Sequence, residues 1–272
     1  MSAGTPADFQ IMGILNVTPD SFSDGGRFTD VPRAVAHGLA MEREGASIID
    51  VGGESTRPGA EPVSEQDELA RVVPVIEGLR AAGLEARISI DTSKAAVAAA
   101  ALEAGAELVN DVSALRADAG MAELVAARGV TCVLMHMRGE PRTMQRDPRY
   151  EDVVGEVRSF LQERLGAALD AGVAEDRIWL DPGIGFGKTA EHNLALLREL
   201  PRLTDLGRPI VIGTSRKSFL GRLTGRDFTG LAAATVATSV LAYERGARVF
   251  RVHDVAPTRD ALIVSAATVG RA

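Results

Sequence analysis

The chain of 272 residues has almost no cysteine and no long apolar run. Cys132 is its single cysteine, so no disulfide can form within the chain, and the apolar neighbours of Cys132 predict a buried thiol. No apolar stretch reaches the roughly 18 residues that a membrane span needs. The first ten residues also lack the basic and apolar regions of a secretory signal. We therefore expect a soluble, cytoplasmic protein without a membrane partner.

Lysine is scarce as well. Only Lys94, Lys188 and Lys217 are lysines among the 30 Lys and Arg residues, and each follows a predicted strand. Such a bias marks Lys188 and Lys217 as positions where a compact ammonium charge is wanted. The net charge of −7 argues against nucleic acid or an anionic membrane as a partner, so an anionic substrate would need local positive charge.

Eight short apolar runs alternate with eight helical patterns. The runs are typical of buried parallel strands and cover residues 11–16, 48–53, 87–92, 108–112, 131–136, 178–183, 209–214 and 249–254. Helical spacing of Ala, Leu and Val covers residues 31–44, 65–81, 95–104, 121–128, 150–171, 190–203, 231–245 and 258–269. Eight such units predict an α/β protein with a single (β/α)8 TIM barrel over residues 11–272, after a flexible segment 1–10. A doubly wound open sheet is the alternative.

One Gly-rich stretch stands out, residues 178–193, with the sequence IWLDPGIGFGKTAEHN. Asp181 ends a predicted buried strand, where a carboxylate is costly unless it is paired. Its two oxygens can accept paired N–H donors from the edge of a planar ring. Glycines at 183, 185 and 187 would let the backbone approach a flat ligand closely. We interpret Asp181 as a ligand anchor, and a structural salt bridge is the alternative.

Polar residues follow nearly every predicted strand, at the barrel end where TIM-barrel active sites form. They are Asn16, residues 54–57, Asp91, Asn110, Asp111, His136, Asp181, residues 215–217, Arg251 and His253. For Asp111 and His136, local loop capping is the preferred interpretation. The acceptors Asp91, Asn110 and Asp181 suit a donor-rich heterocycle, and the donors after the last two strands suit a phosphate. Asn16 could offer a neutral oxygen to Mg²⁺, but no carboxylate cage surrounds it, so the metal would arrive with a phosphate.

The motifs that contain these residues closely resemble those of the dihydropteroate synthases, the sulfonamide targets of folate synthesis. They are GILNVTPDSFSDGGRF (13–28), DVGGESTRPGA (50–60), ISIDTSK (88–94), VNDVSA (109–114), LMHMRGEPRTMQ (134–145), DPGIGFGKTAEHN (181–193), GTSRKSFLG (213–221) and FRVHDV (250–255). The resemblance runs in order from residue 11 to the C-terminus. It implies condensation of 6-hydroxymethyl-7,8-dihydropterin diphosphate with 4-aminobenzoate to give 7,8-dihydropteroate and diphosphate.

The resemblance also implies roles for individual residues. The pterin substrate would be bound by Asp91, Asn110, Met135, Asp181, Gly213 and Lys217. The diphosphate would lie on Asn16, Arg251 and His253 with Mg²⁺, and Arg57 would join them, so that Arg57, Lys217, Arg251 and His253 take part in the catalytic step. The aminobenzoate would pack against Phe22, Thr56, Pro58, Phe186 and Lys217, with its carboxylate near Ser218 at a helix start. For Lys188 a solvated position in a flexible loop is preferred, and for His37 and His192 a surface or capping role.

Two other classes share parts of this pattern. A methyltransferase domain that binds methyltetrahydrofolate would share the pterin-binding half but would not need the ThrArgPro or SerArgLys segments. A non-catalytic pterin-binding protein would not need intact first and second loops, whose glycine-rich composition favours closure over the substrate.

The last two predicted helices lack the polar stripe of a solvent-facing barrel helix. Residues 231–242 and 261–269 carry no charge at all. We therefore predict that the last two or three helices form a homodimer interface, as the resemblance also implies.

Overall fold

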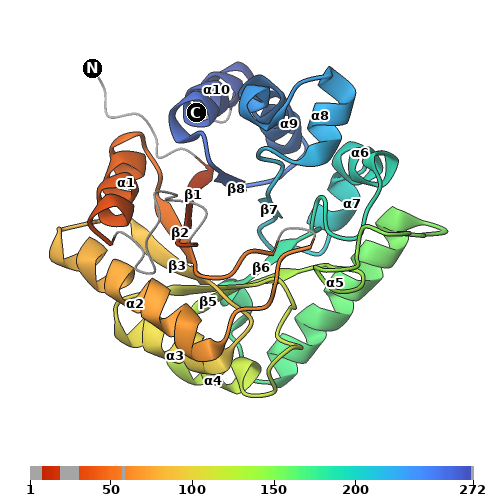
Figure 1. The fold of residues 1–272 in the computed structure, drawn as a ribbon. Coiled ribbons are helices and arrows are strands. Elements are labelled where there is room, and N and C mark those ends of the chain that lie inside the picture. Colours follow the sequence, from red (N-terminus) through yellow and green to blue (C-terminus); the bar gives the residue numbers. More distant parts are fainter. Residues whose placement is uncertain (1–7, 19–30, 57–58, 271–272) are drawn as a thin grey trace.

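The protein is a (β/α)8 barrel, as predicted (Figure 1). The computed structural model describes residues 8–18, 31–56 and 59–270. Eight parallel strands form the inner ring: β1 Gln10–Asn16, β2 Ile48–Gly52, β3 Arg87–Asp91, β4 Leu108–Asp111, β5 Thr131–Met135, β6 Ile178–Asp181, β7 Val211–Ile212 and β8 Val249–Val252. They neighbour one another in the order β6-β5-β4-β3-β2-β1-β8-β7. Only an isolated bridge, Leu180 to Ile210, links β6 to β7 and closes the ring.

The helices lie outside the strands (Figure 1). They are α1 Val31–Arg43, α2 Glu65–Ala81, α3 Ala95–Glu103, α4 Met121–Arg128, α5 Val153–Asp170, α6 Ala190–Arg198, α7 Pro201–Thr204, α8 Ser218–Thr224, α9 Ala232–Glu244 and α10 Val255–Thr268, with short 3-10 helices η2 Glu175–Arg177 and η3 Phe228–Gly230. No helix of the described residues is long and apolar enough to cross a membrane.

Two predicted elements need correction, and one helix was not predicted. The predicted helix 190–203 is two helices, because Pro201 has no N–H to continue the hydrogen-bond ladder of α6 and instead starts α7. The predicted strand 209–214 shrinks to two residues in β7. The seven-residue helix α8 is absent from the predicted helices, although its start at Ser218 is expected from the resemblance.

The barrel begins before the predicted boundary at residue 11. Gln10 is the first residue of β1. Asp8 accepts a hydrogen bond from the hydroxyl of Tyr243 and pairs with Arg248 at 3.1 Å, which ties this segment to α9 and the start of β8. Of the predicted flexible segment 1–10, residues 1–7 lie outside the described residues.

Two separate apolar cores hold the barrel together. The larger one lies between the strands and the helices, and the smaller one fills the barrel interior. The interior core consists of Met12, Ile48, Leu108, Val133, Trp179, Val211 and Val249, one residue from each of seven strands. Because these side chains fill the lower barrel, a ligand can enter only from the end where the strands stop.

Candidate active site

The functional side chains form one inward-facing layer directly above the interior core. Successive strand residues alternate between lumen and helices, so the residue two positions beyond a core residue also points inward. These residues are Asp50 after Ile48, Asn110 after Leu108, Asp181 after Trp179 and Arg251 after Val249. The parallel register sets Asp91 beside Asn110 on the neighbouring strand. We call Asp50, Asp91, Asn110, Asp181 and Arg251 the inner polar layer.

Arg251 connects this layer across the barrel. Its Nε donates to Asp50 Oδ2 and its Nη2 donates to Asp91 Oδ2, each at 2.6 Å. Asn110 donates from Nδ2 to the same oxygen of Asp50 at 3.1 Å. The predicted separation of acceptors from donors is therefore wrong for Arg251, because its guanidinium pairs directly with carboxylates of β2 and β3.

Burial and charge set the protonation of this network. Burial raises the pKa of Asp91 to about 7, with Arg251 opposing the shift and Asp50 adding to it. Burial also disfavours the charge on Arg251, but the carboxylates of Asp50 and Asp91 outweigh it and raise the pKa of the guanidinium. Arg251 is therefore a permanent cation, whereas Asp91 titrates near neutral pH.

Asp181 is buried at the end of β6 and capped by its own loop. Its Oδ1 accepts a hydrogen bond from Gly183 N at 2.7 Å. Burial raises the pKa of Asp181, while the Gly183 N–H and the cations Lys217 and Arg251 oppose the shift. No hydrogen bond to the other carboxylate oxygen is found among the described residues, and Met135 is the register partner of Asp181 on β5.

The glycines of residues 183–187 serve the packing of two loops. Gly183 has φ of +67°, and a Cβ there would lie 1.9 Å from the carbonyl oxygen of His136. A Cβ on Gly187 would lie 2.3 Å from the carbonyl oxygen of Arg138. The predicted reason for these glycines needs correction, because at both positions the close neighbour is the backbone that follows β5.

Lys217 and Phe186 stand together at the edge of the layer. The Nζ of Lys217 lies 4.1 Å from the ring centroid of Phe186, which is cation–π geometry. A Cβ on Gly185 would meet the Lys217 stem at 3.1 Å, so this glycine makes room for the lysine. Together the ammonium and the ring offer one charged and one flat surface beside Asp181.

The preferred interpretation of Lys188 as a solvated charge is wrong. Its side chain is buried, and Nζ donates to Gly183 O at 2.9 Å and Phe186 O at 3.0 Å and contacts His136 Nδ1 at 2.8 Å. Burial lowers the pKa of Lys188 well below its ordinary value, and burial together with Lys188 lowers the pKa of His136 to about 2. Lys188 thus joins the loop that carries Phe186 to the end of β5.

The loops after β7 and β8 meet through His253. Its Nδ1 lies 2.9 Å from Ser215 Oγ, and its backbone N–H donates to the same oxygen at 3.1 Å. Gly213 lies next to Arg251, since a Cβ on this glycine would be 3.9 Å from the arginine Cβ. Ser218 is exposed at the first position of α8.

Asn16, the predicted metal-binding residue, lies at the end of β1. A Cβ on Gly52 would lie 3.7 Å from Asn16 Oδ1 and 3.6 Å from Asp91 Oδ2, so both oxygens flank the end of β2. The described residues contain no group of three or more His, Cys, Asp or Glu side chains that could hold a metal ion. This donor set fits Mg²⁺ that brings most of its oxygens from water and a phosphate.

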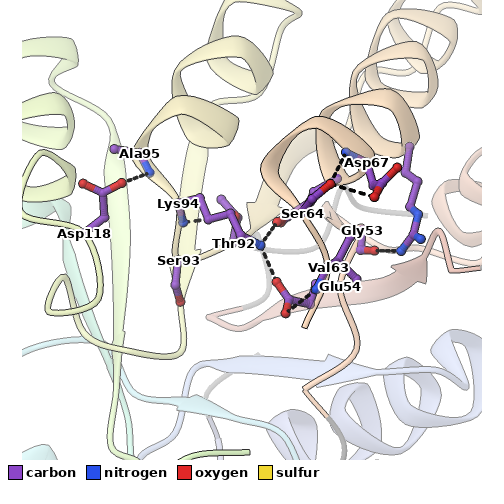
Figure 2. Close-up of polar contacts among 12 residues, drawn as sticks. Gly53, Glu54, Val63, Ser64, Asp67, Thr92, Ser93, Lys94, Ala95 and Asp118 are labelled. Atoms are coloured by element: carbon purple, nitrogen blue, oxygen red, sulfur yellow. Dashed lines mark hydrogen bonds and ion pairs between the residues drawn. The ribbon is translucent and has the colours of Figure 1, made fainter. Parts of the chain in front are cut away.

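The loop between β2 and α2 is fastened at its base (Figure 2). Lys94 Nζ lies 2.5 Å from both Glu54 Oε2 and Glu68 Oε2, and Glu68 is fully buried. Glu54 Oε1 also accepts from Val63 N at 3.2 Å, which joins the two ends of the loop. The hydroxyl of Ser64 then caps α2 by accepting from Asp67 N. Lys94 is therefore a structural lysine that holds this loop at the barrel mouth.

A groove of about 180 Å³ lies between this loop and the one that follows β5. It is lined by Glu54, Ser55, Thr56, Ala60, Pro62, Glu140, Pro141 and Arg142. Thr56, which the resemblance places near the aminobenzoate, thus lines this groove. The predicted site residues Phe22, Arg57 and Pro58 lie outside the described residues.

The capping roles predicted for Asp111 and His192 and the surface position predicted for His37 are confirmed. Asp111 accepts from Ser113 N and Leu115 N at 2.7 and 2.8 Å, which closes its own loop. His192 forms a capping box with Thr189 at the start of α6, and His37 is exposed on α1. Asp50 is the site residue that the sequence interpretation missed, although its place two residues after Ile48 was a usable signal.

Comparisons with known proteins cover the whole barrel. The sequence profile of the family described as "Pterin binding enzyme" matches residues 12–253. The dihydropteroate synthase of Mycobacterium leprae (strain TN) is 51% identical over 265 residues, which are 95% of this chain and 93% of the relative. The Yersinia pestis dihydropteroate synthase with a sulfonamide drug complex aligns with a TM-score of 0.91 at 45% identity, over 96% of this chain and 94% of that one. The Xanthomonas albilineans enzyme in complex with 7,8-dihydropteroate has a TM-score of 0.86 at 48% identity, over 96% and 93%. The profile match contains every residue of the inner polar layer.

Proposed function

The chain belongs to the pterin-binding enzyme family and, within it, to the dihydropteroate synthases, and on this premise we propose how its barrel mouth performs the reaction. The enzyme is a transferase that condenses 6-hydroxymethyl-7,8-dihydropterin diphosphate with 4-aminobenzoate to 7,8-dihydropteroate and diphosphate. Our proposal concerns the residues that bind the two substrates. The observation that carries it is the inner polar layer, in which three carboxylates, an amide and one cation face the same lumen.

The dihydropterin ring would lie on the acceptors of this layer. Asp91, Asn110 and Asp181 offer oxygens to the ring N–H groups, because carboxylate and amide oxygens match a heterocycle rich in donors. Met135 and Gly213 would border the ring, and Lys217 would donate to one of its acceptors. Support comes from the burial of Asp181 with one oxygen occupied by Gly183 N and the other available.

The diphosphate would leave toward donors that lie on β8, directly after it, and in the loop between β2 and α2. The Nη1 of Arg251 has no hydrogen bond within the described part of the chain, so it can donate to a phosphate oxygen while Nε and Nη2 stay paired. His253 would add a second donor, and Arg57 a third. Asn16 would hold Mg²⁺ together with the diphosphate, and the ion would supply charge neutralisation for the leaving group.

The aminobenzoate would bind on the outer side of the dihydropterin. The Phe186 ring and the Lys217 ammonium provide a flat and a positive surface at 4.1 Å from each other. Thr56, Phe22 and Pro58 would cover the ring, and Ser218 at the start of α8 would lie near the carboxylate. The N–H groups of a helix start favour a negative charge there.

The reaction needs positioning and charge stabilisation more than acid–base chemistry. The C–O bond to diphosphate breaks, the electron-rich dihydropterin shares the positive charge of the methylene, and the aminobenzoate nitrogen forms the new C–N bond and loses a proton. An arylamine is neutral near pH 7 and already nucleophilic. The chain's own task is therefore to hold the two substrates in line, to exclude water from the cation and to stabilise the departing anion.

The assignment is tested by the release of diphosphate. The purified enzyme with Mg²⁺ and dihydropterin diphosphate should release diphosphate only when 4-aminobenzoate is added. Alanine at Asn110 or Arg251 should lower the affinity for the dihydropterin substrate, with 4-aminobenzoate binding little changed. Full affinity in both variants would refute the assignment of these residues.

We also propose a homodimer through α8, α9 and α10. Most large apolar side chains that are exposed in the described residues lie in this region, namely Leu223, Phe228, Leu241, Ile263, Val264 and Val269. The polarity of α9 is inverted, since Thr235, Thr238 and Ser239 are buried against the barrel while Leu241 faces outward. An apolar outer face of this kind is what a two-fold interface covers.

A cytoplasmic location is the last part of the proposal. Both substrates are anions, and a dihydropterin diphosphate does not cross a bilayer unaided because its charges are too costly to bury. Cell fractionation tests this directly, and activity in a secreted fraction alone would contradict it.

A further inference from the structure

We propose that Asp50 is a positioning residue for the reaction, which holds Asn110 and Arg251 in the orientations that receive the dihydropterin diphosphate. The inference rests on the substrate roles that the proposed function gives to Asn110 and Arg251. Asp50 is fully buried on β2, whereas Asn110 and Arg251 retain some exposure, so we infer that Asp50 acts through these two residues and touches no substrate.

The contact with Asn110 determines which way its amide faces. A carboxylate can only accept, so the amide nitrogen must point at Asp50 Oδ2, as the 3.1 Å contact from Nδ2 shows. The carbonyl oxygen of Asn110 is then turned away from Asp50 and is available to accept from a ligand. Without Asp50 the amide could rotate and present a donor where the dihydropterin also has donors.

The contact with Arg251 fixes the plane of the guanidinium. Nε is the donor closest to the side-chain stem, and its 2.6 Å bond to Asp50 restricts rotation of the whole fork. The bond from Nη2 to Asp91 fixes the second corner. The two carboxylates lie on neighbouring strands, β2 and β3, so Arg251 reaches across the lumen from β8 to a rigid base.

A purely structural role does not account for this carboxylate. Its second oxygen, Oδ1, is buried and has no hydrogen-bond partner among the described residues. A buried ion with an unsatisfied oxygen costs the fold stability, and an apolar residue of similar size would avoid that cost. The position of Asp50 is explained by the two donors that share its other oxygen.

The test compares two variants at this position by steady-state kinetics and by pterin binding. Asp50→Ala removes the acceptor, and we expect the KM for dihydropterin diphosphate to rise about tenfold or more, because a buried hydrogen bond to a charged group is lost. The KM for 4-aminobenzoate should change less than about threefold. Asp50→Asn keeps one carbonyl oxygen at this place and should rescue part of the loss.

A double-variant cycle separates positioning from stability. In an Arg251→Ala background, Asp50→Ala should have a much smaller effect on pterin affinity than in the native enzyme. Asp111→Asn is the matched control, since Asp111 is equally buried but caps its own loop, and it should lower the melting temperature without changing pterin affinity. If Asp50→Ala does not fold, Asp50→Asn decides, and native pterin affinity in that variant would overturn the inference.

The outcomes also distinguish this inference from the proposed function. If Asn110→Ala and Arg251→Ala weaken pterin binding while both Asp50 variants keep native affinity, the positioning role fails and the site stands. If the Asn110 and Arg251 variants themselves keep native affinity, the assignment of the site fails and the Asp50 inference falls with it.

Discussion

Replacing Asp181 with asparagine should separate ligand binding from stability. Asparagine has nearly the same shape, and its carbonyl oxygen can still accept the hydrogen bond from Gly183 N that aspartate accepts at 2.7 Å. The other carboxylate oxygen becomes an NH₂ group. Where the native enzyme offers an acceptor to the dihydropterin, the variant would offer a donor, so the ring N–H groups would meet no partner.

The expected loss of affinity is large. A hydrogen bond to a charged acceptor contributes about 1.5–3 kcal/mol, and the remaining oxygen of Asp181 supplies at least one such bond. That energy corresponds to a roughly 10- to 100-fold rise in the Kd for the dihydropterin. Isothermal titration with the pterin substrate in the absence of 4-aminobenzoate measures it directly.

Asp181→Asn should raise the stability of the ligand-free enzyme, although it weakens pterin binding. Burial raises the pKa of Asp181 above its value in the unfolded chain, so between the two values the native state binds more protons. The free energy of unfolding contributed by this group therefore falls as pH rises through the native pKa. Asparagine has no such loss, and its stability advantage should grow as pH rises above the pKa of an aspartate in the unfolded chain, about 3.9. A variant with near-native affinity, or with a lowered melting temperature at pH 8, would refute the anchoring role of Asp181.

Three further predictions concern other parts of the molecule. Lys188→Met should lower the free energy of unfolding by about 3 kcal/mol, because three buried acceptors lose their donor. At roughly 2–4 °C per kcal/mol, thermal scans should show a melting temperature lower by roughly 6–12 °C. A melting temperature within about 2 °C of the native value would contradict the buried contacts. Pterin affinity should fall as pH decreases from 8 to 6, by up to about tenfold per pH unit, since the pKa of Asp91 is raised to about 7 and protonation removes the acceptor; Asp91→Asn should bind weakly at every pH, and an unchanged pH profile in that variant would point to another group. Val264→Glu places a charge on the proposed dimer face and should give a monomer in light scattering, whereas Glu191→Gln on the exposed part of α6 should not.

The sequence was sufficient for the barrel because each strand carries its own signal. Residues 132–135, for example, are apolar on both faces, as a strand between helices and a filled interior must be. The weakest prediction was the strand at 209–214, of which only Val211–Ile212 is assigned as β7. The predicted run begins with Pro209, which has no N–H, and Gly213 lies near its end, so local composition overstated the length.

The site was predictable where a residue ends a strand and was missed where it depends on distant partners. Asp91 and Asp181 are the last residues of their strands, and Asn110 is the last but one of β4. The pairing of Arg251 with Asp50 joins residues 201 positions apart, and no local pattern encodes it. The prediction for Lys188 was wrong for the same reason. A lysine in a glycine-rich loop looks solvent-exposed in the sequence, and no local pattern shows that its ammonium contacts three buried acceptors.

The ring of strands has one seam. Seven neighbouring pairs are joined by regular ladders, but β6 and β7 share only the bridge from Leu180 to Ile210 and the hydrogen bond from Leu180 N to Pro209 O at 2.9 Å. Asp181 is the last residue of β6, and Lys217 lies in the loop that follows β7. A dihydropterin that bonds to both residues would link β6 to the loop after β7. Substrate binding would therefore stabilise the barrel where the backbone hydrogen bonding between strands is weakest.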